Sequence, residues 1–273
     1  MATKTIQSSG AFLTRLNSVA SNSLVNVSWS VIFAAKWSTA VPGVFPCAFA
    51  LQGQVVSGVH NATHDWTEWF QDDPADGDDI ETFSSSTTGS PVTQVVGSNS
   101  ALVGKWIHIG LTRNVSGNTN FYVLTEGFNP SSPTFLFTPS NPGTTCGVDD
   151  GGNTLVWNDN SSDLGIGISI GHFIQCNVEL TQAQVISQFQ QRAPISTVTG
   201  GTYTYLVCDG DDLTNVATDT GNVATNFTGN TTGGSFSADT TQPQEWGGAV
   251  GPTSGSSQLR CSSRLATTTR MAV

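Results

Sequence analysis

Tryptophans flanked by acidic and amide residues are the clearest candidate binding groups in this sequence. Two of them fall in the polar, acidic stretch 61–79, whose composition predicts a long surface loop, and a third begins the Trp-Asn-Asp-Asn run at 157–160. Aromatic faces can cover the apolar patches of a sugar ring, while neighbouring carboxylate and amide groups bond its hydroxyls. The candidate carbohydrate-binding residues are therefore Trp66, Trp69, Trp157, Asn158 and Asp159. The alternative is that these tryptophans fill the edge of the fold or a subunit interface.

A dense run of aspartates at 72–79 places hard oxygen ligands next to the turn residue Gly77. Calcium prefers this ligand chemistry, although Pro74 and Phe83 break the EF-hand pattern. The candidate metal ligands are Asp72, Asp76, Asp78 and Asp79. Calcium is the one cofactor that the sequence suggests, and a solvated acidic loop is the alternative.

Patterns that resemble catalytic motifs lack the context that their chemistry requires. Residues 167–171 read Gly-Ile-Ser-Ile-Gly, but a nucleophile elbow needs a sharp strand-to-helix turn, and this run lies inside an alternating strand. His60 and His64 have the spacing of zinc ligands on a helix without the glutamate base. No glutamate has a second acid at the strand spacing that glycosidases use. We therefore expect no catalytic residue and no enzyme activity.

The C-terminal tail, residues 246–273, carries cations but no acids. Its arginines stand in a Ser-, Thr- and Gly-rich background, and Glu245 is the last acidic residue of the chain. A basic segment of this kind is suited to docking on an acidic neighbour. We predict Arg260, Arg264 and Arg270 to be docking residues.

The composition favours an acidic protein built from many short strands. Only 11% of the 273 residues are charged, glycine numbers 29, and the net charge is -11. Such a charge would repel a phosphate backbone or an anionic membrane, and no run approaches the ~20 apolar residues that spanning a bilayer requires. We therefore expect neither a nucleic-acid partner nor membrane insertion. The five cysteines contain no C-x-x-C pair, which favours buried thiols, with one inter-strand bridge as the alternative.

Alternating apolar residues predict the strands that would position these groups. In the run 25–33, every second residue is apolar and large, so these residues share one face of a strand. The run 105–113 alternates in the same way, with Trp106 and His108 opposite the aliphatic residues. A Ser-Gly-Asn turn then leads into 120–124, which predicts a hairpin.

The period changes to that of a helix near 181–190. Thr181 and Gln184 have the spacing of a capping box, and Val185, Ile186 and Phe189 lie on one helical face. Most of the sequence beyond this helix is Gly-, Asn- and Thr-rich hairpin material, in which we expect Phe227 and Phe236 to point inward.

The segments 105–113 and 121–123 resemble the central hairpin of the laminin-G/concanavalin A-like jelly rolls. That hairpin has a Trp-x-His-hydrophobic strand followed by a Tyr-Val-Asp-Gly turn, and here Thr-Glu-Gly at 125–127 replaces the usual Asp-Gly. Residues 166–186 are similar to the late strand and short helix of the same family, and 27–31 to its early strand. His108 and His172 are strand residues of this pattern, so the resemblance implies structural histidines that are held by hydrogen bonds.

The resemblance implies an all-β jelly-roll sandwich with one short helix and an extended C-terminal tail. We expect an N-terminal arm at 1–20, the sandwich at 21–245 with closing strands at about 200–240, and a docking tail at 246–273. Proteins of this family include lectins, adhesion modules and viral surface proteins, so the fold alone does not select a function.

The function favoured by these features is that of a virion structural or decoration protein, and a bacteriophage is the favoured kind of virus. The N-terminal residues lack the pattern of an export signal, the composition is acidic and polar, and the tail is basic. Such a protein would lie on the virion surface, anchored to capsid or fibre by its termini, as a homo-oligomer or array. The alternative is an extracellular carbohydrate-binding lectin or adhesion module with glycans as partners.

Overall fold

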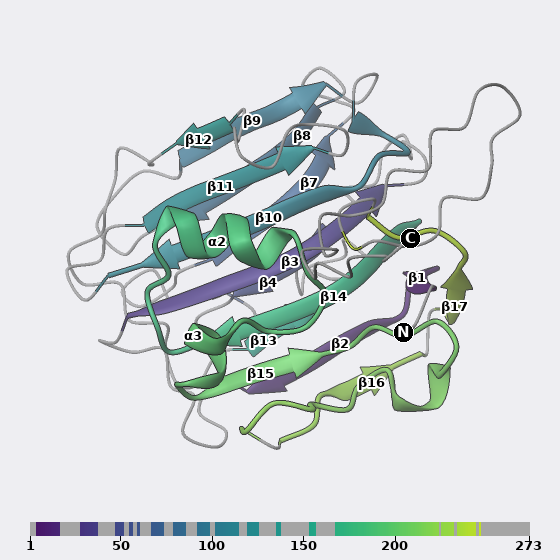
Figure 1. Cartoon of the computed structure of the whole chain (residues 1–273). Coiled ribbons are helices and arrows are strands. Elements are labelled where there is room, and N and C mark those ends of the chain that lie inside the picture. Colours follow the sequence, from purple (N-terminus) through teal and green to yellow (C-terminus); the bar gives the residue numbers. More distant parts are fainter. Residues whose placement is uncertain are drawn as a thin grey trace, which may run out of the picture.

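A computed structural model describes residues 4–16, 28–37, 47–51, 55–56, 59–60, 67–73, 79–85, 92–98, 102–114, 119–125, 135–137, 153–156, 167–223, 225–231, 234–243 and 246. In this part of the chain, two large antiparallel sheets form a sandwich, and one helix of two turns lies on its outside (Figure 1). The predicted all-β jelly-roll sandwich is confirmed.

The larger sheet, sheet A, has eight strands among the described residues, in the order β12-β11-β10-β3-β14-β1-β17, with β15 also paired to β14. Its strands are β1 (Thr5–Ser8), β3 (Trp29–Trp37), β10 (Ile107–Arg113), β11 (Thr119–Thr125), β12 (Phe135–Phe137), β14 (Ile168–Cys176), β15 (Tyr203–Leu206) and β17 (Phe236–Asp239). β1 pairs with residues 168–170 of β14, and β15 pairs with residues 173–176. These two strands therefore follow one another along the same edge of β14.

The second sheet, sheet B, has seven strands among the described residues, in the order β16-β2-β13-β4-β7-β8-β9. Its strands are β2 (Phe12–Leu16), β4 (Cys47–Leu51), β7 (Thr67–Asp73), β8 (Asp79–Ser85), β9 (Val92–Ser98), β13 (Asn153–Val156) and β16 (Thr228–Asn230). A separate two-stranded hairpin joins β5 (Val55–Val56) and β6 (Val59–His60).

The core between the sheets follows the alternation predicted for β3. Trp29, Val31 and Phe33 are fully buried in one cluster, while residues 25–27 of the predicted run lie outside the described residues. Phe33 packs against Phe49 of sheet B, with ring centroids 5.6 Å apart. Each side chain buried in this way stabilises the sandwich by about 1.5–3 kcal/mol.

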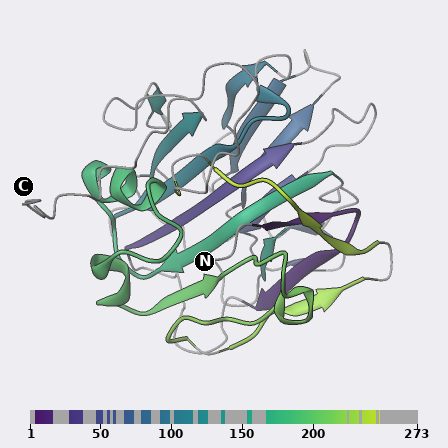
Figure 2. The same cartoon turned by 45° about the vertical axis from the view of Figure 1, so that its right-hand side comes forward.

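The outer face of sheet A is covered by the predicted helix, α2 (Gln182–Phe189), and by the short helix α3 (Ser196–Thr199) (Figures 1 and 2). α2 packs closely on β10 because Gly110 has no side chain, and a Cβ there would lie 2.8 Å from Cγ1 of Val185. A 3-10 turn, η1 (Leu213–Asn215), follows β15. Within the described residues, no helix has the length and apolarity needed to cross a bilayer.

The predicted capping box starts α2. The backbone N–H of Gln184 donates to Oγ1 of Thr181 at 3.4 Å, and the backbone N–H of Thr181 donates to Oε1 of Gln184 at 2.8 Å. Two backbone donors that have no partner inside the helix are satisfied in this way.

Replacing Thr181 with alanine is expected to lower the free energy of unfolding by about 1 kcal/mol, because the cap is lost while the chain remains otherwise unchanged. Urea unfolding followed by circular dichroism measures this loss. Ser187 is exposed in the same helix, and Ser187→Ala should leave stability within about 0.5 kcal/mol. Equal effects of the two substitutions would contradict a role of the cap.

The described residues of the predicted N-terminal arm belong to the sandwich instead. β1 pairs with β14 and β17 in sheet A, and β2 pairs with β13 and β16 in sheet B. Ile6 and Leu13 are fully buried. These strands are short and separated by a Ser-Ser-Gly turn, so neither has an alternation long enough to predict a strand.

The stretch 61–79, expected to be a surface loop, also contains sheet structure. Residues 67–73 form β7, which pairs with β4 on one side and β8 on the other. The loop prediction was wrong here. β7 forms because its backbone pairs with two neighbouring strands, and its polar sequence has no alternation that predicts a strand.

The described end of the chain agrees better with expectation. β15, β16 and β17 are closing strands between residues 203 and 239. Phe227 is buried, and Phe236 is partly buried against the same core.

Two cysteines are buried free thiols, Cys176 and Cys208. Burial raises the pKa of Cys176 to about 11 and that of Cys208 to about 12. Both therefore stay protonated and pack as small apolar groups, as the sequence predicted.

Candidate functional site

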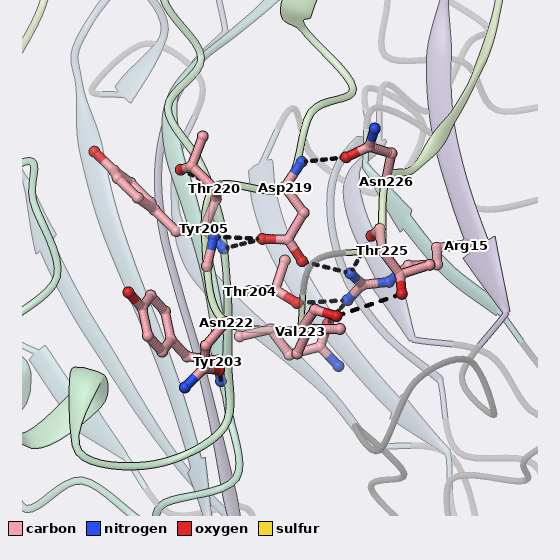
Figure 3. A network of polar contacts seen from close by, with 12 residues as sticks. Arg15, Tyr203, Thr204, Tyr205, Asp219, Thr220, Asn222, Val223, Thr225 and Asn226 are labelled. Carbon is pink, nitrogen blue, oxygen red and sulfur yellow. Dashed lines mark hydrogen bonds and ion pairs between the residues drawn. The ribbon is translucent and has the colours of Figure 1, made fainter.

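A buried arginine joins the two sheets at the edge of the sandwich. Arg15 follows Leu13 by two residues in β2, so both side chains point to the interior. The Arg15 guanidinium lies 4.3 Å from the centroid of Phe227. It donates to Oγ1 of Thr204 in β15 at 2.7 Å and to the carbonyl of Thr225 at 3.0 Å (Figure 3).

The charge of Arg15 is balanced by Asp219. Nη1 of Arg15 lies 3.0 Å from Oδ2 of Asp219, and the exposed fractions of the two side chains are 4% and 0%. Burial lowers the pKa of Arg15 from its usual value, and the Asp219 carboxylate opposes that shift. The other carboxylate oxygen, Oδ1, accepts from the backbone N–H groups of Tyr205 at 2.9 Å and Gly221 at 2.8 Å.

Residues 219–223 use these contacts to cover the open edge of β15. The N–H of Thr220 donates to the carbonyl of Tyr205 at 2.9 Å, and that of Val223 donates to the carbonyl of Tyr203 at 3.2 Å. Oδ1 of Asn222 accepts from the N–H of Tyr203 at 2.8 Å. Residues 219–223 thus take the place of a neighbouring strand. The backbone N–H and C=O groups of β15, which could otherwise pair with a strand of another protein, are bonded within the chain.

Two tyrosines and three polar side chains lie around this covered edge. Tyr203 and Tyr205 are half-buried on the same face of β15, and Figure 3 shows both rings directed away from the ion pair. Burial raises the pKa of Tyr205 to about 12, so its phenol is neutral at physiological pH. The side chains of Thr220 and Asn222 are exposed beside them, and that of Asn226 is exposed on the far side of Asp219 (Figure 3). We call these five residues the binding edge.

The backbone of the binding edge is held rigidly. Oδ1 of Asn226 accepts from the N–H of Asp219 at 3.0 Å, and Nδ2 of Asn222 donates to the carbonyl of Gly201 at 2.8 Å. The Thr220 hydroxyl donates to the carbonyl of Tyr205 at 2.9 Å, so a polar ligand would use the remaining lone pairs of this oxygen and the second N–H of the Asn222 amide. The half-buried rings beside them would contact the apolar faces of that ligand. Because these groups are ordered beforehand, binding would cost little conformational entropy.

The acidic turn beside the binding edge uses its carboxylates internally. Asp211 pairs with Nζ of Lys4 at 2.6 Å. Asp212 accepts from Nδ2 of Asn215 at 2.7 Å and Oγ1 of Thr214 at 2.6 Å, and these bonds lower its pKa. Among the residues that the structure describes, no group of three or more His, Cys, Asp or Glu side chains could hold a metal ion.

The candidate sites from the sequence fall mostly elsewhere. Trp66, Asp76, Asp78, Trp157, Asn158, Asp159, Arg260, Arg264 and Arg270 lie outside the described residues. Trp69 and Asp72 are positions of β7, and Asp79 begins β8. The register pairs Asp79 with Asp73 and pairs Asp72 with Ile80. The proposed carbohydrate and calcium roles of these residues stay predictions.

The Gly-Ile-Ser-Ile-Gly run lies in a strand, as predicted. Residues 168–176 form β14, and the hydroxyl of Ser169 donates to Oδ2 of Asp239. The sharp strand-to-helix turn of a nucleophile elbow is absent at this position.

No protein-family model and no curated protein sequence matches this chain. Solved structures that match include bacteriophage CBA120 tailspike protein 2 enzymatically active domain, at 11% identity and a TM-score of 0.45, covering 67% of this chain and 27% of that one. The botulinum neurotoxin serotype D binding domain matches at 12% identity and a TM-score of 0.41, with 69% and 48% covered.

The Ruminococcus gnavus IT-sialidase CBM40 matches at 10% identity and a TM-score of 0.40, covering 60% of this chain and 83% of that one. The chain spans less than half of the length of the tailspike and toxin structures. At these identities and TM-scores, the matches assign neither a family nor a function. Membership of the laminin-G/concanavalin A-like family stays a prediction.

Proposed function

We propose that this protein is a non-enzymatic binding module that recognises carbohydrate at the binding edge. The observation that supports this is the placement of exposed Thr220 and Asn222 beside the half-buried rings of Tyr203 and Tyr205. Sugars present hydroxyls and apolar ring faces together, and this edge offers partners for both.

The proposal uses none of the residues selected from the sequence. The sequence favoured tryptophans because of their large aromatic faces, whereas the binding edge is built from tyrosines and short polar side chains. The binding edge and the tryptophans are both candidate carbohydrate sites. The same glycans can therefore show which of the two binds.

Replacing Tyr203 with alanine is expected to weaken glycan binding about tenfold or more, equivalent to about 1.4 kcal/mol, because an apolar contact for the sugar ring is lost. The full chain is first tested on an array of immobilised glycans. The affinity of the best ligand is then measured by calorimetry for the native chain and Tyr203→Ala.

Ser187→Ala, an exposed change on α2, is the matched control and should bind as the native chain does. Unchanged binding by Tyr203→Ala together with lost binding by Trp157→Ala would move the site to the residues selected from the sequence. A folded protein that binds no glycan on the array would contradict the carbohydrate proposal.

A role on a virus particle is a separate proposal about where such a module is carried. It is supported by the basic tail with Arg260, Arg264 and Arg270 on an otherwise acidic chain, which suits docking on an acidic capsid or fibre protein. Co-sedimentation of the native chain with a large particle, lost when residues 251–273 are deleted, is the expected result. Free monomer in the native source would contradict it.

A further inference from the structure

Trp246, the first residue of the basic tail, lies on the outer face of sheet A. Its ring stacks on His172 with centroids 4.7 Å apart and an interplanar angle of 21°. Its Nε1 donates to the carbonyl of Phe189, the last residue of α2, at 3.2 Å. His108 meets the same ring edge-on at 5.9 Å. We call the surrounding residues, Gly171, His172, His108, Phe189 and Arg192, the indole socket.

A β-bulge makes room for the indole. The register of β14 against β3 shifts between Ile170 and His172, so Gly171 is the extra residue. A Cβ at Gly171 would lie 2.5 Å from Cη2 of Trp246. Only glycine leaves this seat open, and the bulge brings Gly171 and His172 to the same side of the sheet.

His172 is buried under Trp246 without the hydrogen bonds that a charged imidazole needs. It is fully buried, and neither of its ring nitrogens has a hydrogen-bond partner among the described residues. The sequence predicted a hydrogen-bonded structural histidine, and this was wrong because the ring is held by stacking. Burial holds the pKa of His172 well below its usual value, with smaller contributions from His108 and Arg192.

The ionisable groups around the socket include a fixed cation. Arg192, in the loop after α2, lies 5.7 Å from the centroid of Trp246. His108 approaches from β10 and stacks on Phe189 with centroids 5.2 Å apart. A second positive charge at His172 would therefore be repelled.

The carboxylates on the adjoining elements are already paired. Asp239 of β17 lies 2.6 Å from Nζ of Lys36 of β3, and it also accepts from Ser169 of β14. Lys4, which precedes β1, is bonded to Asp211. These carboxylates are thus engaged by other partners.

We propose that the indole socket is an acid-sensitive latch, in which protonation of His172 releases Trp246 and with it the start of the basic tail. Docking is stable while the imidazole is neutral. An imidazolium needs acceptors for two N–H groups, and the stacked indole supplies neither, although its face attracts a cation. This inference goes beyond carbohydrate binding and does not depend on it.

Acid should weaken the docking of Trp246, because His172 binds a proton less tightly while Trp246 covers it. Once Trp246 leaves, the ring meets solvent, and its pKa returns to about 6.5. Above that pH, docking does not depend on pH. Below it, the docking equilibrium constant falls about tenfold per pH unit until the docked form also protonates. Between pH 7.5 and 5.0, the expected fall is about 30-fold.

Hydrogen exchange of the Trp246 indole N–H measures this opening directly, because that N–H is protected by its bond to Phe189. The full chain is labelled with 15N, and the Trp246 signal is assigned as the one that Trp246→Phe removes. At each pH, the exchange rate of a free indole is divided by the measured exchange rate, which gives a protection factor. Trp37, fully buried in the core, reports opening of the whole sandwich.

The expected result is a protection factor for Trp246 that falls about 30-fold from pH 7.5 to 5.0 while that of Trp37 stays constant. His172→Phe keeps an aromatic ring that cannot be protonated and should remove the pH dependence. Constant protection of Trp246 in the native chain would overturn the proposal. So would an equal fall in His172→Phe, or a fall shared equally by Trp37.

A reciprocal measurement does not require His172→Phe to fold. The ring protons of His172 are titrated by NMR in the native chain and in Trp246→Ala. Removing the indole should bring the His172 midpoint up toward its ordinary value, because docking and protonation exclude each other. An unchanged midpoint would show that Trp246 does not control the proton affinity of His172 and would overturn the latch.

Discussion

Replacing Asp219 with alanine is expected to lower the free energy of unfolding by about 3–5 kcal/mol, a large part of the total stability of a domain. Asp219 and Arg15 are almost completely removed from water, with side-chain exposures of 0% and 4%. Without the carboxylate, the Arg15 guanidinium remains buried and unpaired. The N–H groups of Tyr205 and Gly221 also lose their acceptor.

Urea unfolding followed by tryptophan fluorescence measures this loss. Asp219→Asn separates its two causes, because the amide oxygen still accepts from the backbone while the negative charge is gone. We expect Asp219→Asn to cost about 2–3 kcal/mol in the native background.

The background Arg15→Met removes the buried cation while keeping an unbranched side chain. Asp219→Asn should cost less than about 1 kcal/mol there, because no unpaired guanidinium remains. The double-mutant cycle therefore predicts a coupling of about 2 kcal/mol. Equal costs of Asp219→Asn in both backgrounds would show that the charge of Asp219 does not stabilise the fold through Arg15.

Loss of the ion pair should also disorder the binding edge. Asp219 holds residues 219–223 against β15, and Thr220 and Asn222 belong to that segment. Stability and recognition are thus linked at this edge, since the buried charges fix the exposed groups.

The parts of the fold that the sequence could predict are those encoded by local patterns. Apolar residues alternate with other residues along β3 and β10, and this period predicted which residues share each face of these strands. α2 was predicted from its capping box, because Thr181 and Gln184 are only three residues apart. Strands at the sheet edges, such as β1, are too short for any period to be counted.

The binding edge could not be predicted because its contacts join distant parts of the chain. Arg15 and Asp219 are 204 residues apart in the sequence, and no local pattern connects them. One signal was available: Arg15 follows Leu13 at the spacing of one strand face, and an inward arginine requires a buried acid. Which of the 20 acidic residues supplies it depends on the topology.

The indole socket shows the same limit on the other side of the sheet. The sequence indicated that His108 and His172 lie in strands, and it placed residue 246 at the start of the tail. It could not indicate that the bulge at Gly171 brings an indole onto His172, because a bulge is a property of strand pairing.

Replacing Arg192 with lysine is expected to cost about 2 kcal/mol although the charge is kept. β1 and β15 lie end to end along β14, and the Arg192 guanidinium spans the gap between them. Nε and Nη2 both donate to the carbonyl of Val207, at 3.2 and 2.8 Å, and the two N–H groups of Nη2 are shared with the carbonyls of Lys4 at 3.2 Å and Cys208 at 2.7 Å. Cys208 has a φ of 50°, a conformation rare for a residue with a side chain, so the bonded carbonyl contributes to holding a strained turn.

An ammonium group cannot reproduce the planar fork of a guanidinium, so Arg192→Lys should leave some of these carbonyls without a donor. Arg192→Met, which removes the charge as well, should cost about 3 kcal/mol. Both are measured by urea unfolding, with Ser187→Ala as the control. If Arg192→Lys were as stable as the native chain while Arg192→Met was not, charge alone would hold the junction of β1 and β15, and the geometry of the fork would be irrelevant.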